Sequence, residues 1–414
     1  MGDKKKYDLK IFTDLIEPEA SNQIYRLMAQ PAFSDCKVRI MPDVHAGAGC
    51  VIGFTADLGD KVIPNIVGVD IGCGMLTVMI HRDSNVDLEK LDEVIHNHIP
   101  SGFDIHDRPY MQYPYIKNLY CYDQLKNRDR FEQSICTLGG GNHFIEVDEH
   151  PNGTKFLVIH TGSRNLGKQV AEYYQKVALD QFYNKDIQKQ RQNALIESLT
   201  TAGLQRLIQY EVQKLKSEFN ASGALNIPKD LCYLEGDLRK HYLHDMGICQ
   251  DYAKTNRFQI AKEIFDKMQW GSLALGFETI HNYIDIESNI VRKGAVSAKD
   301  GERLLIPINM RDGCLLCRGK GNPDWNYSAP HGAGRLMSRK KAKETLSLED
   351  YKDSMAGIHT TSVGADTIDE APMAYKPIES ILDNIKDTVE VEAILKPIYN
   401  FKASESNDQR KGID

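Results

Sequence analysis

The 414-residue sequence has no uninterrupted run of apolar residues long enough for a membrane-crossing helix, which needs about 18 to 20. Its start, Met1 to Lys10, is polar and rich in lysine, and no apolar segment follows. A secretory signal would have such a segment. We therefore expect a cytoplasmic protein that neither spans a membrane nor is secreted.

The sequence also has no regular cysteine spacing and no excess of positive charge. Its nine cysteines are odd in number, which argues against a disulfide framework and favours a reducing compartment. The formal net charge is −7, so any contact with nucleic acid depends on a local basic patch. With 41% hydrophobic and 26% charged residues, the composition is that of a folded globular protein.

The first 165 residues contain short apolar runs that end at Gly, Asp or Pro, which is typical of buried strands joined by tight turns. These runs are Lys37 to Met41, Gly49 to Thr55, Val62 to Val69, Met75 to Ile80 and Phe156 to His160.

Two later segments have helical periodicity. From residue 168 to about residue 220 glycine nearly vanishes and apolar residues recur at helical spacing, and a second such stretch runs from Asp245 to Met268. Residues 404–414 form a polar tail. We predict a single α+β domain over residues 1–414, in which a β-rich core carries the site and the 168–220 helical insertion lies outside it.

Residues of the kinds that bind metal occur beside glycine turns and strand ends. Asp70 and Cys73 are three apart on a glycine-rich turn, His143 follows three glycines, and His160 ends an apolar run. A thiolate can bridge two metal ions where an imidazole cannot. The alternative is structural, since a lone cysteine or histidine is often a buried core residue. By itself His281 also has that structural interpretation.

Other segments suit phosphate binding. The glycines at 139–141 free backbone N–H groups to approach an anion, and Asn142 and Glu146 follow them. Glycine flanks leave His331 accessible, and five cations follow it within twelve residues, which supplies a local basic patch. The pair Cys314 and Cys317 has no second pair to complete a four-cysteine site, so we assign it no metal.

Taken together, these segments resemble the RtcB family of GTP-dependent RNA ligases. The resemblance covers roughly residues 38 to 402, in family order, and is carried by seven motifs. They are Pro42–His45, Gly68–Met75, Gly141–Glu146, His160–Arg164, Arg292–Ala295, His331–Arg335 and Asp369–Lys376.

The resemblance implies joining of RNA with a 3′-phosphate or 2′,3′-cyclic phosphate to RNA with a 5′-hydroxyl, using GTP and two Mn²⁺ ions, in RNA repair or tRNA splicing. It implies that Cys73 bridges the two ions, with Asp70 and His143 on one and His160 and His281 on the other. It also implies that a larger set of residues, which includes two of the metal-binding histidines, contacts the nucleotide. These are Asn142, His143, Phe144, Ile145, Glu146, His281, Asn282, Pro307, Ile308, Asn309, Met310, Cys314, His331, Gly332, Ala333, Gly334 and Lys402.

In the family's reaction the neutral imidazole of His331 attacks the α-phosphorus of GTP, and GMP then passes to the RNA 3′-phosphate. We hypothesise that Asp43 orients His331 through its other ring nitrogen. The candidates for contacts with RNA phosphates are Arg164, Lys293, Arg335 and Arg339.

This sequence departs from the family pattern beside the nucleotide. Where the family has Pro-Gly-Ser-Met-Gly, residues 307–311 read Pro-Ile-Asn-Met-Arg, and Cys314 stands in place of a serine. The preference for GTP over ATP is therefore open, as is the bound metal, because Cys, His and Asp ligands suit Zn²⁺ as well. Neither the RNA substrate nor an archease-type activator follows from the residues.

Two other functions fit part of the same pattern. A two-metal phosphoesterase would use the Asp, Cys and His residues for hydrolysis and would form no covalent nucleotide on His331. An RNA-end-binding protein would keep the basic patch and lack turnover. The ligase is preferred because the metal-binding residues, His331 and Lys402 are all present together.

Overall fold

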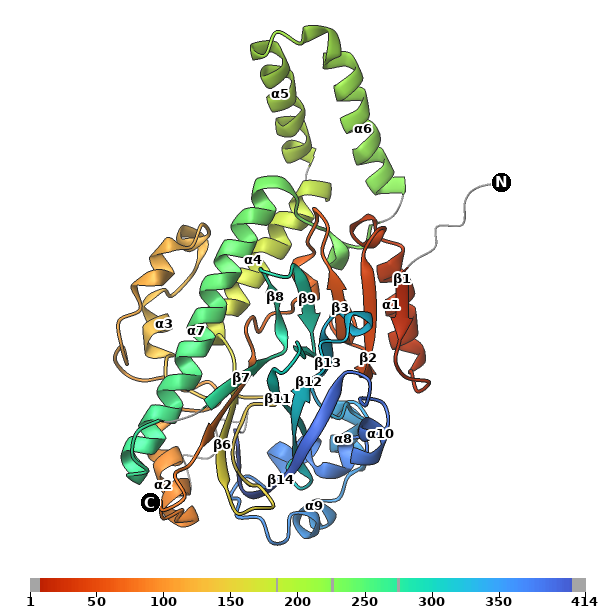
Figure 1. The fold of residues 1–414 in the computed structure, drawn as a ribbon. Coiled ribbons are helices and arrows are strands. Elements are labelled where there is room, and N and C mark those ends of the chain that lie inside the picture. Colours follow the sequence, from red (N-terminus) through yellow and green to blue (C-terminus); the bar gives the residue numbers. More distant parts are fainter. Residues whose placement is uncertain (1–7, 184, 225–226, 274–275, 404–414) are drawn as a thin grey trace.

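The computed structural model describes residues 8–183, 185–224, 227–273 and 276–403. Two large sheets form its centre, with most of the helices around them (Figure 1). The larger sheet has seven antiparallel strands in the order β11-β12-β14-β5-β6-β4-β7. The strands of this sheet are β4 Gly74–Met79, β5 Phe144–Glu149, β6 Lys155–Thr161, β7 Gly276–Ile280, β11 Arg303–Asn309, β12 Gly313–Gly319 and β14 Val389–Lys402.

The second sheet has five strands in the order β1-β2-β3-β9-β8, of which only the β1–β2 pair is parallel. A separate two-stranded pair joins β10 and β13. The bounds are β1 Asp8–Ile11, β2 Lys37–His45, β3 Ile52–Asp57, β8 Asn282–Asp285, β9 Ile290–Lys293, β10 Ala295–Ser297 and β13 Ser328–Pro330.

The α-helices pack around these sheets or extend beyond them. They are α1 Pro18–Met28, α2 Leu88–His98, α3 Asp129–Gln133, α4 Arg164–Tyr183, α5 Lys185–Thr201, α6 Ile208–Ala224, α7 Gly236–Met268, α8 Arg339–Thr345, α9 Leu348–Ser354 and α10 Ile378–Leu382. The 3₁₀ helices are η1 Pro31–Phe33, η2 Pro64–Ile66, η3 Pro114–Asn118, η4 Tyr122–Gln124, η5 Gln205–Leu207, η6 Lys229–Leu231, η7 Pro323–Trp325, η8 Ala365–Glu370 and η9 Pro372–Ala374.

Helix α7 is the main helical support of the sheets, and α4 lies beside it (Figure 1). The apolar stripe of α7 is fully buried, because residues three and four apart share one helix face that turns toward the core. This stripe includes Met246, Cys249, Ala253, Ile260 and Ile264. The packing of α7 against β4 and β6 fixes the strand ends where the candidate site lies.

The predicted α+β class with a β-rich core and added helices is confirmed. The strands expected at Lys37 to Met41, Gly49 to Thr55, Met75 to Ile80 and Phe156 to His160 correspond to β2, β3, β4 and β6. The strand expected over Val62 to Val69 is wrong. Its centre is the 3₁₀ helix η2, because Pro64 has no N–H for a strand ladder and suits a helical first position.

The helical expectations need two corrections. Helix α7 begins at Gly236, well before Asp245, because most of its first two turns are polar and give no apolar stripe. The expected 168–220 insertion comprises most of α4 together with α5 and α6, but α4 is not outside the core, since Val170 and Tyr174 are buried. Only α5 and α6 project away as a pair (Figure 1).

The tail at 404–414 lies outside the described residues. The single-domain boundary of 1–414 stays a prediction. Within the described ranges, none of the helices combines the length and the apolar character that a bilayer crossing requires.

Candidate metal and nucleotide site

Strand register brings together side chains that are far apart in the sequence. In the seven-stranded sheet Gly74 of β4 lies opposite Thr161 of β6 on one side and Ile280 of β7 on the other. Cys73 directly precedes β4, and its carbonyl accepts a hydrogen bond from the backbone N–H of His281 at 3.0 Å. Neighbouring strand ends therefore deliver Cys73, His160 and His281 to one place.

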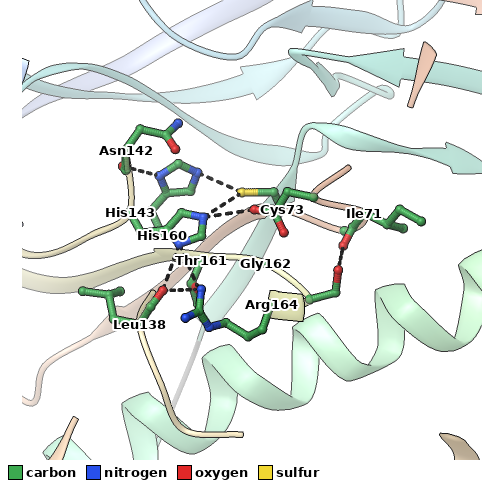
Figure 2. A network of polar contacts seen from close by, with 12 residues as sticks. Ile71, Cys73, Leu138, Asn142, His143, His160, Thr161, Gly162 and Arg164 are labelled. Atoms are coloured by element: carbon green, nitrogen blue, oxygen red, sulfur yellow. Dashed lines mark hydrogen bonds and ion pairs between the residues drawn. The ribbon is translucent and has the colours of Figure 1, made fainter. Parts of the chain in front are cut away.

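A chain of close contacts runs through this place, with the Cys73 thiol at its centre (Figure 2). The Cys73 Sγ is 3.6 Å from His143 Nε2 and 3.3 Å from His160 Nε2. His143 Nε2 lies 3.0 Å from Asp70 Oδ2, and His160 Nε2 lies 3.4 Å from His281 Nε2. We call Asp70, Cys73, His143, His160 and His281 the Cys73 cluster.

The hydrogen bonds behind two of the imidazoles determine which nitrogen faces the cluster. His143 Nδ1 donates to the carbonyl of Leu138 at 2.9 Å, and His160 Nδ1 donates to that of Asn142 at 3.1 Å. A carbonyl only accepts, so Nδ1 carries a proton in both rings and Nε2 is the nitrogen that faces Cys73; in His143 this nitrogen also meets Asp70. This is the orientation in which a histidine binds a metal ion.

Burial favours the uncharged forms of Cys73, His160 and His281. It lowers the pKa values of His160 and His281 well below their ordinary range, and the neighbouring imidazoles add to this effect. It raises the pKa of the Cys73 thiol well above its ordinary value, and Asp70 raises it further. Burial also acts to raise the pKa of Asp70, but the contacts with His143 and Cys73 and the nearby Arg164 together outweigh that effect and leave the pKa lowered.

The cluster fits divalent metal ions as two overlapping sets of ligand atoms. Asp70, Cys73 and His143 form one set and Cys73, His160 and His281 the other, and the ligand atoms of each set lie within 4.8 Å of one another. The shared residue is the thiol. Neutral imidazoles, a carboxylate and a thiol that can lose its proton are the ligand forms that such ions accept.

His331 continues the same line of residues on the side of His281. The two ring centroids are 5.1 Å apart. On its other side His331 Nδ1 lies 2.7 Å from Asp43 Oδ2, and the backbone N–H of His331 donates to that oxygen too. The predicted contact between Asp43 and His331 is therefore present, and it leaves Nε2 of a neutral ring unprotonated.

A cavity of about 270 Å³ opens beside His331. Its lining brings together most of the residues predicted to bind the nucleotide. They are Asn142, Phe144, Glu146, His281, Pro307, Ile308, Asn309, Met310, His331, Gly332, Ala333, Gly334 and Lys402. We call this space the His331 cavity.

Four residues of the predicted nucleotide set do not line this cavity. Ile145 alternates to the opposite face of β5 and joins the main hydrophobic core, and Asn282 accepts a hydrogen bond from Gly294 N–H. Cys314 is buried beneath Glu146, and His143 lies on the other side of Cys73.

The four arginine and lysine residues predicted to contact RNA lie in different parts of the structure. Arg335 and Arg339 line the His331 cavity and pair with Glu370. Lys293 is buried, and its ammonium donates to the carbonyls of Ala48 and Asn65. Arg164 donates to Thr137 Oγ1 and to the carbonyl of Gly102.

A second cavity, of about 550 Å³, lies at the other end of the Cys73 cluster. Asp70, His143 and Arg164 line it, so the cluster separates two cavities. We call this space the Asp70 cavity. Its wall includes Phe103, whose surface is 72% exposed.

Sequence reasoning missed several lining residues. His45 and Tyr375 line the His331 cavity, and both lie inside motifs already noted at Pro42–His45 and Asp369–Lys376. Arg130 and Lys168 line the Asp70 cavity, and nothing near them in the sequence marks them.

A buried cluster of Cys, His and Asp side chains between two cavities on a sheet-rich core is typical of metal-dependent enzymes. The comparisons with known proteins define the group more closely. The family model described as tRNA-splicing ligase RtcB matches residues 23–119 and 120–403. The chain belongs to the RtcB family.

Individual relatives agree with this assignment. The RNA-splicing ligase RtcB of Escherichia coli K12 is 29% identical over 426 residues, covering 94% of this chain and 95% of the relative. The tRNA-splicing ligase RtcB of Archaeoglobus fulgidus is 27% identical, covering 89% and 87%. That of Aeropyrum pernix is 26% identical, covering 83% and 82%.

Proposed function

We propose that this protein is a GTP- and Mn²⁺-dependent RNA ligase. It joins RNA with a 3′-phosphate or 2′,3′-cyclic phosphate to RNA with a 5′-hydroxyl, and it acts through a GMP–histidine intermediate on His331. Membership of the RtcB family supports the ligase class. The observation that carries the chemistry is the line of contacts from Asp43 through His331 and His281 to the Cys73 cluster.

In this proposal the Cys73 cluster holds two Mn²⁺ ions. Asp70, Cys73 and His143 bind one, and Cys73, His160 and His281 bind the other, in agreement with the two sets of ligand atoms. When bound, the ions supply positive charge that stabilises the transferring phosphoryl groups. Zn²⁺ suits the same ligands and, by intrinsic affinity, competes with Mn²⁺ for them.

His331 Nε2 is the nucleophile. Its electron pair forms a bond to the α-phosphorus of GTP, and the bond to pyrophosphate breaks. The 3′-phosphate of RNA then takes the GMP from His331, and the 5′-hydroxyl attacks that phosphate and expels GMP. Asp43 holds Nδ1 at 2.7 Å, which keeps the proton away from the attacking nitrogen.

The nucleotide occupies the His331 cavity, between Asn142, Phe144 and Glu146 on one wall and the 307–310 and 331–334 segments on the other. Lys402 projects into the same space, where its ammonium pairs with Glu370 at 2.5 Å. The substituted loop at 307–311 is also held internally. Asn309 donates a hydrogen bond to Asp312 at 2.8 Å, and Arg311 pairs with Asp312. Because this loop differs from the family pattern, the base preference is best measured with GTP and ATP in parallel.

RNA lies at the Asp70 cavity in this proposal. Arg130, Arg164 and Lys168 give its wall positive charge, and the exposed ring of Phe103 is a surface on which a base can stack. Arg335 and Arg339 contact RNA phosphates from the His331 cavity, and the ammonium of buried Lys293 holds the segments at Ala48 and Asn65 in place. We place the protein in the cytoplasm as one domain over residues 1–414, with an archease-type activator as a partner to test.

The test of the function is covalent labelling. Protein reloaded with MnCl₂ is incubated with GTP labelled at the α-phosphate and run on a denaturing gel, with labelled ATP in parallel. We expect a label from GTP that is absent in His331→Ala and Cys73→Ala. No label from either nucleotide would remove the ligase proposal and leave the two-metal phosphoesterase.

Asp43→Asn tests the positioning of His331. The amide can donate to Nδ1 and so favour the tautomer with a proton on Nε2, and we expect labelling to slow by about 10- to 100-fold. The readout is the labelling rate from pH 6 to 9. If Asp43→Asn labels as fast as wild type over this range, Asp43 has no part in positioning His331.

A further inference from the structure

A second group of metal-binding side chains lies beneath the His331 cavity. Glu146 and Asp148 are two apart on β5 and so point to the same face of the sheet, and Cys314 on β12 faces them across β14. One ligand atom from each lies within 4.8 Å of the others. We call these three residues the Cys314 cluster.

The Cys314 cluster shares no residue with the Cys73 cluster and has different surroundings. Asp148 is fully buried, and neither carboxylate oxygen makes a hydrogen bond of good geometry with the described residues, although the Cys314 thiol lies close enough to lower its pKa. Asn400 Nδ2 donates to Glu146, while the Asn400 amide oxygen is also buried without a partner in this part of the chain. Burying a carboxylate without hydrogen-bond donors costs free energy, so these oxygens need a cation or a proton beside them.

The charges around the Cys314 cluster also favour a bound cation. Lys402 is close enough to lower the pKa of Glu146, but its ammonium is already paired with Glu370 at 2.5 Å. Burial and the Asp148 carboxyl outweigh Lys402 and raise the pKa of Glu146 well above its ordinary value, while burial raises that of Asp148 to about 7. A bound cation would offset this cost of burial, because metal ions bind carboxyl groups in their ionised form.

From this arrangement we propose that Glu146, Asp148 and Cys314 bind a third divalent transition-metal ion, with Zn²⁺ as the preferred occupant. A thiolate and two carboxylates carry three negative charges, which one divalent ion offsets in large part. Mixed sulfur and oxygen ligands favour Zn²⁺ over Mg²⁺ or Ca²⁺. The 3.9 Å between Cys314 Sγ and Glu146 Oε2 is near the roughly 3.5 Å expected for two ligands of a tetrahedral ion.

The neighbouring cysteine provides a matched control. Cys317 lies on β12 like Cys314 and is equally buried. The pairing of β12 with β14 shifts register between Leu316 and Cys317, and Cys317 packs into a different hydrophobic cluster from Cys314. Its thiol faces the carbonyl of Leu315 at 3.7 Å. Cys317→Ser therefore changes a buried thiol on β12 without touching the Cys314 cluster.

The first experiment counts bound metal. The purified full chain is stripped with a chelator and dialysed against buffered Zn²⁺, and bound zinc is measured by atomic emission. We expect Cys314→Ser and Asp148→Asn to bind one equivalent fewer than wild type and than Cys317→Ser, with affinity at this site reduced by at least about 100-fold. Equal zinc content in wild type, Cys314→Ser and Asp148→Asn would overturn the proposal.

A second measurement separates this site from the proposed function. In Cys73→Ala the Cys73 cluster has lost its thiol, so a thiolate-to-metal absorption band with added Co²⁺ must come from another cysteine. We expect that band in Cys73→Ala and in Cys73→Ala with Cys317→Ser, but not in Cys73→Ala with Cys314→Ser. No band in Cys73→Ala would overturn the third site and would leave the ligase proposal untouched, because labelling on His331 is measured independently.

Discussion

The Cys73 and Cys314 clusters lie on the same seven-stranded sheet, each with one buried thiol, but their other ligands differ. The Cys73 cluster surrounds its thiol mainly with imidazoles, and burial favours the neutral form of His160 and His281. The Cys314 cluster surrounds its thiol with two carboxylates, whose buried oxygens are unsatisfied at Asp148. A protein can therefore keep an imidazole-rich site folded without metal at little cost, whereas a carboxylate-rich site depends on a proton or a cation.

The largest expected difference is in nucleotide labelling. Cys73→Ala removes the one residue shared by both ligand sets, and we expect labelling with GTP to fall by about 1,000-fold or more. Asp148→Asn changes a residue that does not line the His331 cavity, and we expect a change of less than about tenfold. Equal losses in the two variants, measured on the same gel, would make the clusters one functional unit.

The next effect is on stability in the absence of metal. The folded-state pKa of Asp148 is raised from 3.8 to about 7, so its contribution to stability is fully present below about pH 4 and is lost as pH rises through 7. Asp148→Asn removes this loss, and we expect the metal-stripped variant to be more stable than wild type at pH 8 by about 2 to 4 kcal/mol. The measurement is chemical denaturation at pH 5 and pH 8. An equal difference at both pH values would contradict the assigned titration.

A smaller effect tests the geometry of the Cys73 cluster. A Cβ at Gly162 would collide with the carboxylate of Asp70, so Gly162→Ala should displace that ligand. We expect Mn²⁺ affinity to fall by about 10- to 100-fold. Gly59→Ala is the control, because a Cβ there meets nothing within 4 Å. Unchanged Mn²⁺ binding by Gly162→Ala would show that Asp70 is not held where the proposal needs it.

The smallest effect is a difference in pH slope. Zinc binding at the Cys73 cluster displaces the thiol proton, so its affinity should rise about tenfold per pH unit from pH 6 to 7. The Cys314 cluster loses a carboxyl proton in addition and should respond more steeply over the same range. Competition with a chelator in Asp148→Asn and in Cys73→Ala measures the two slopes separately. Identical slopes would contradict the expectation that the Cys314 cluster releases more protons than the Cys73 cluster when zinc binds.

The sequence alone was enough for the α+β class, for most of the strands that were named, and for Asp70, Cys73, His143 and His160 as candidate metal ligands, whereas His281 was named only through the family resemblance. Strand periodicity and helix periodicity are local, and glycine turns beside Cys and His mark where strands end. Motif order then led to the RtcB family before any contact was known. The strand wrongly expected at Val62 to Val69 has a local cause, since Pro64 at its centre favours η2.

Tertiary structure alone decided which residues share a space. Asp43 and His331 are 288 residues apart, and only the packing of β2 beside β13 brings them to 2.7 Å. Cys314 was expected to contact the nucleotide and instead lies beneath the His331 cavity with Asp148, because strand order, which no local pattern encodes, sets β12 beside β14 and β14 beside β5. The sequence determined the chemical types at the site, and long-range strand pairing determined their partners, because pairing depends on burial and register across the whole sheet.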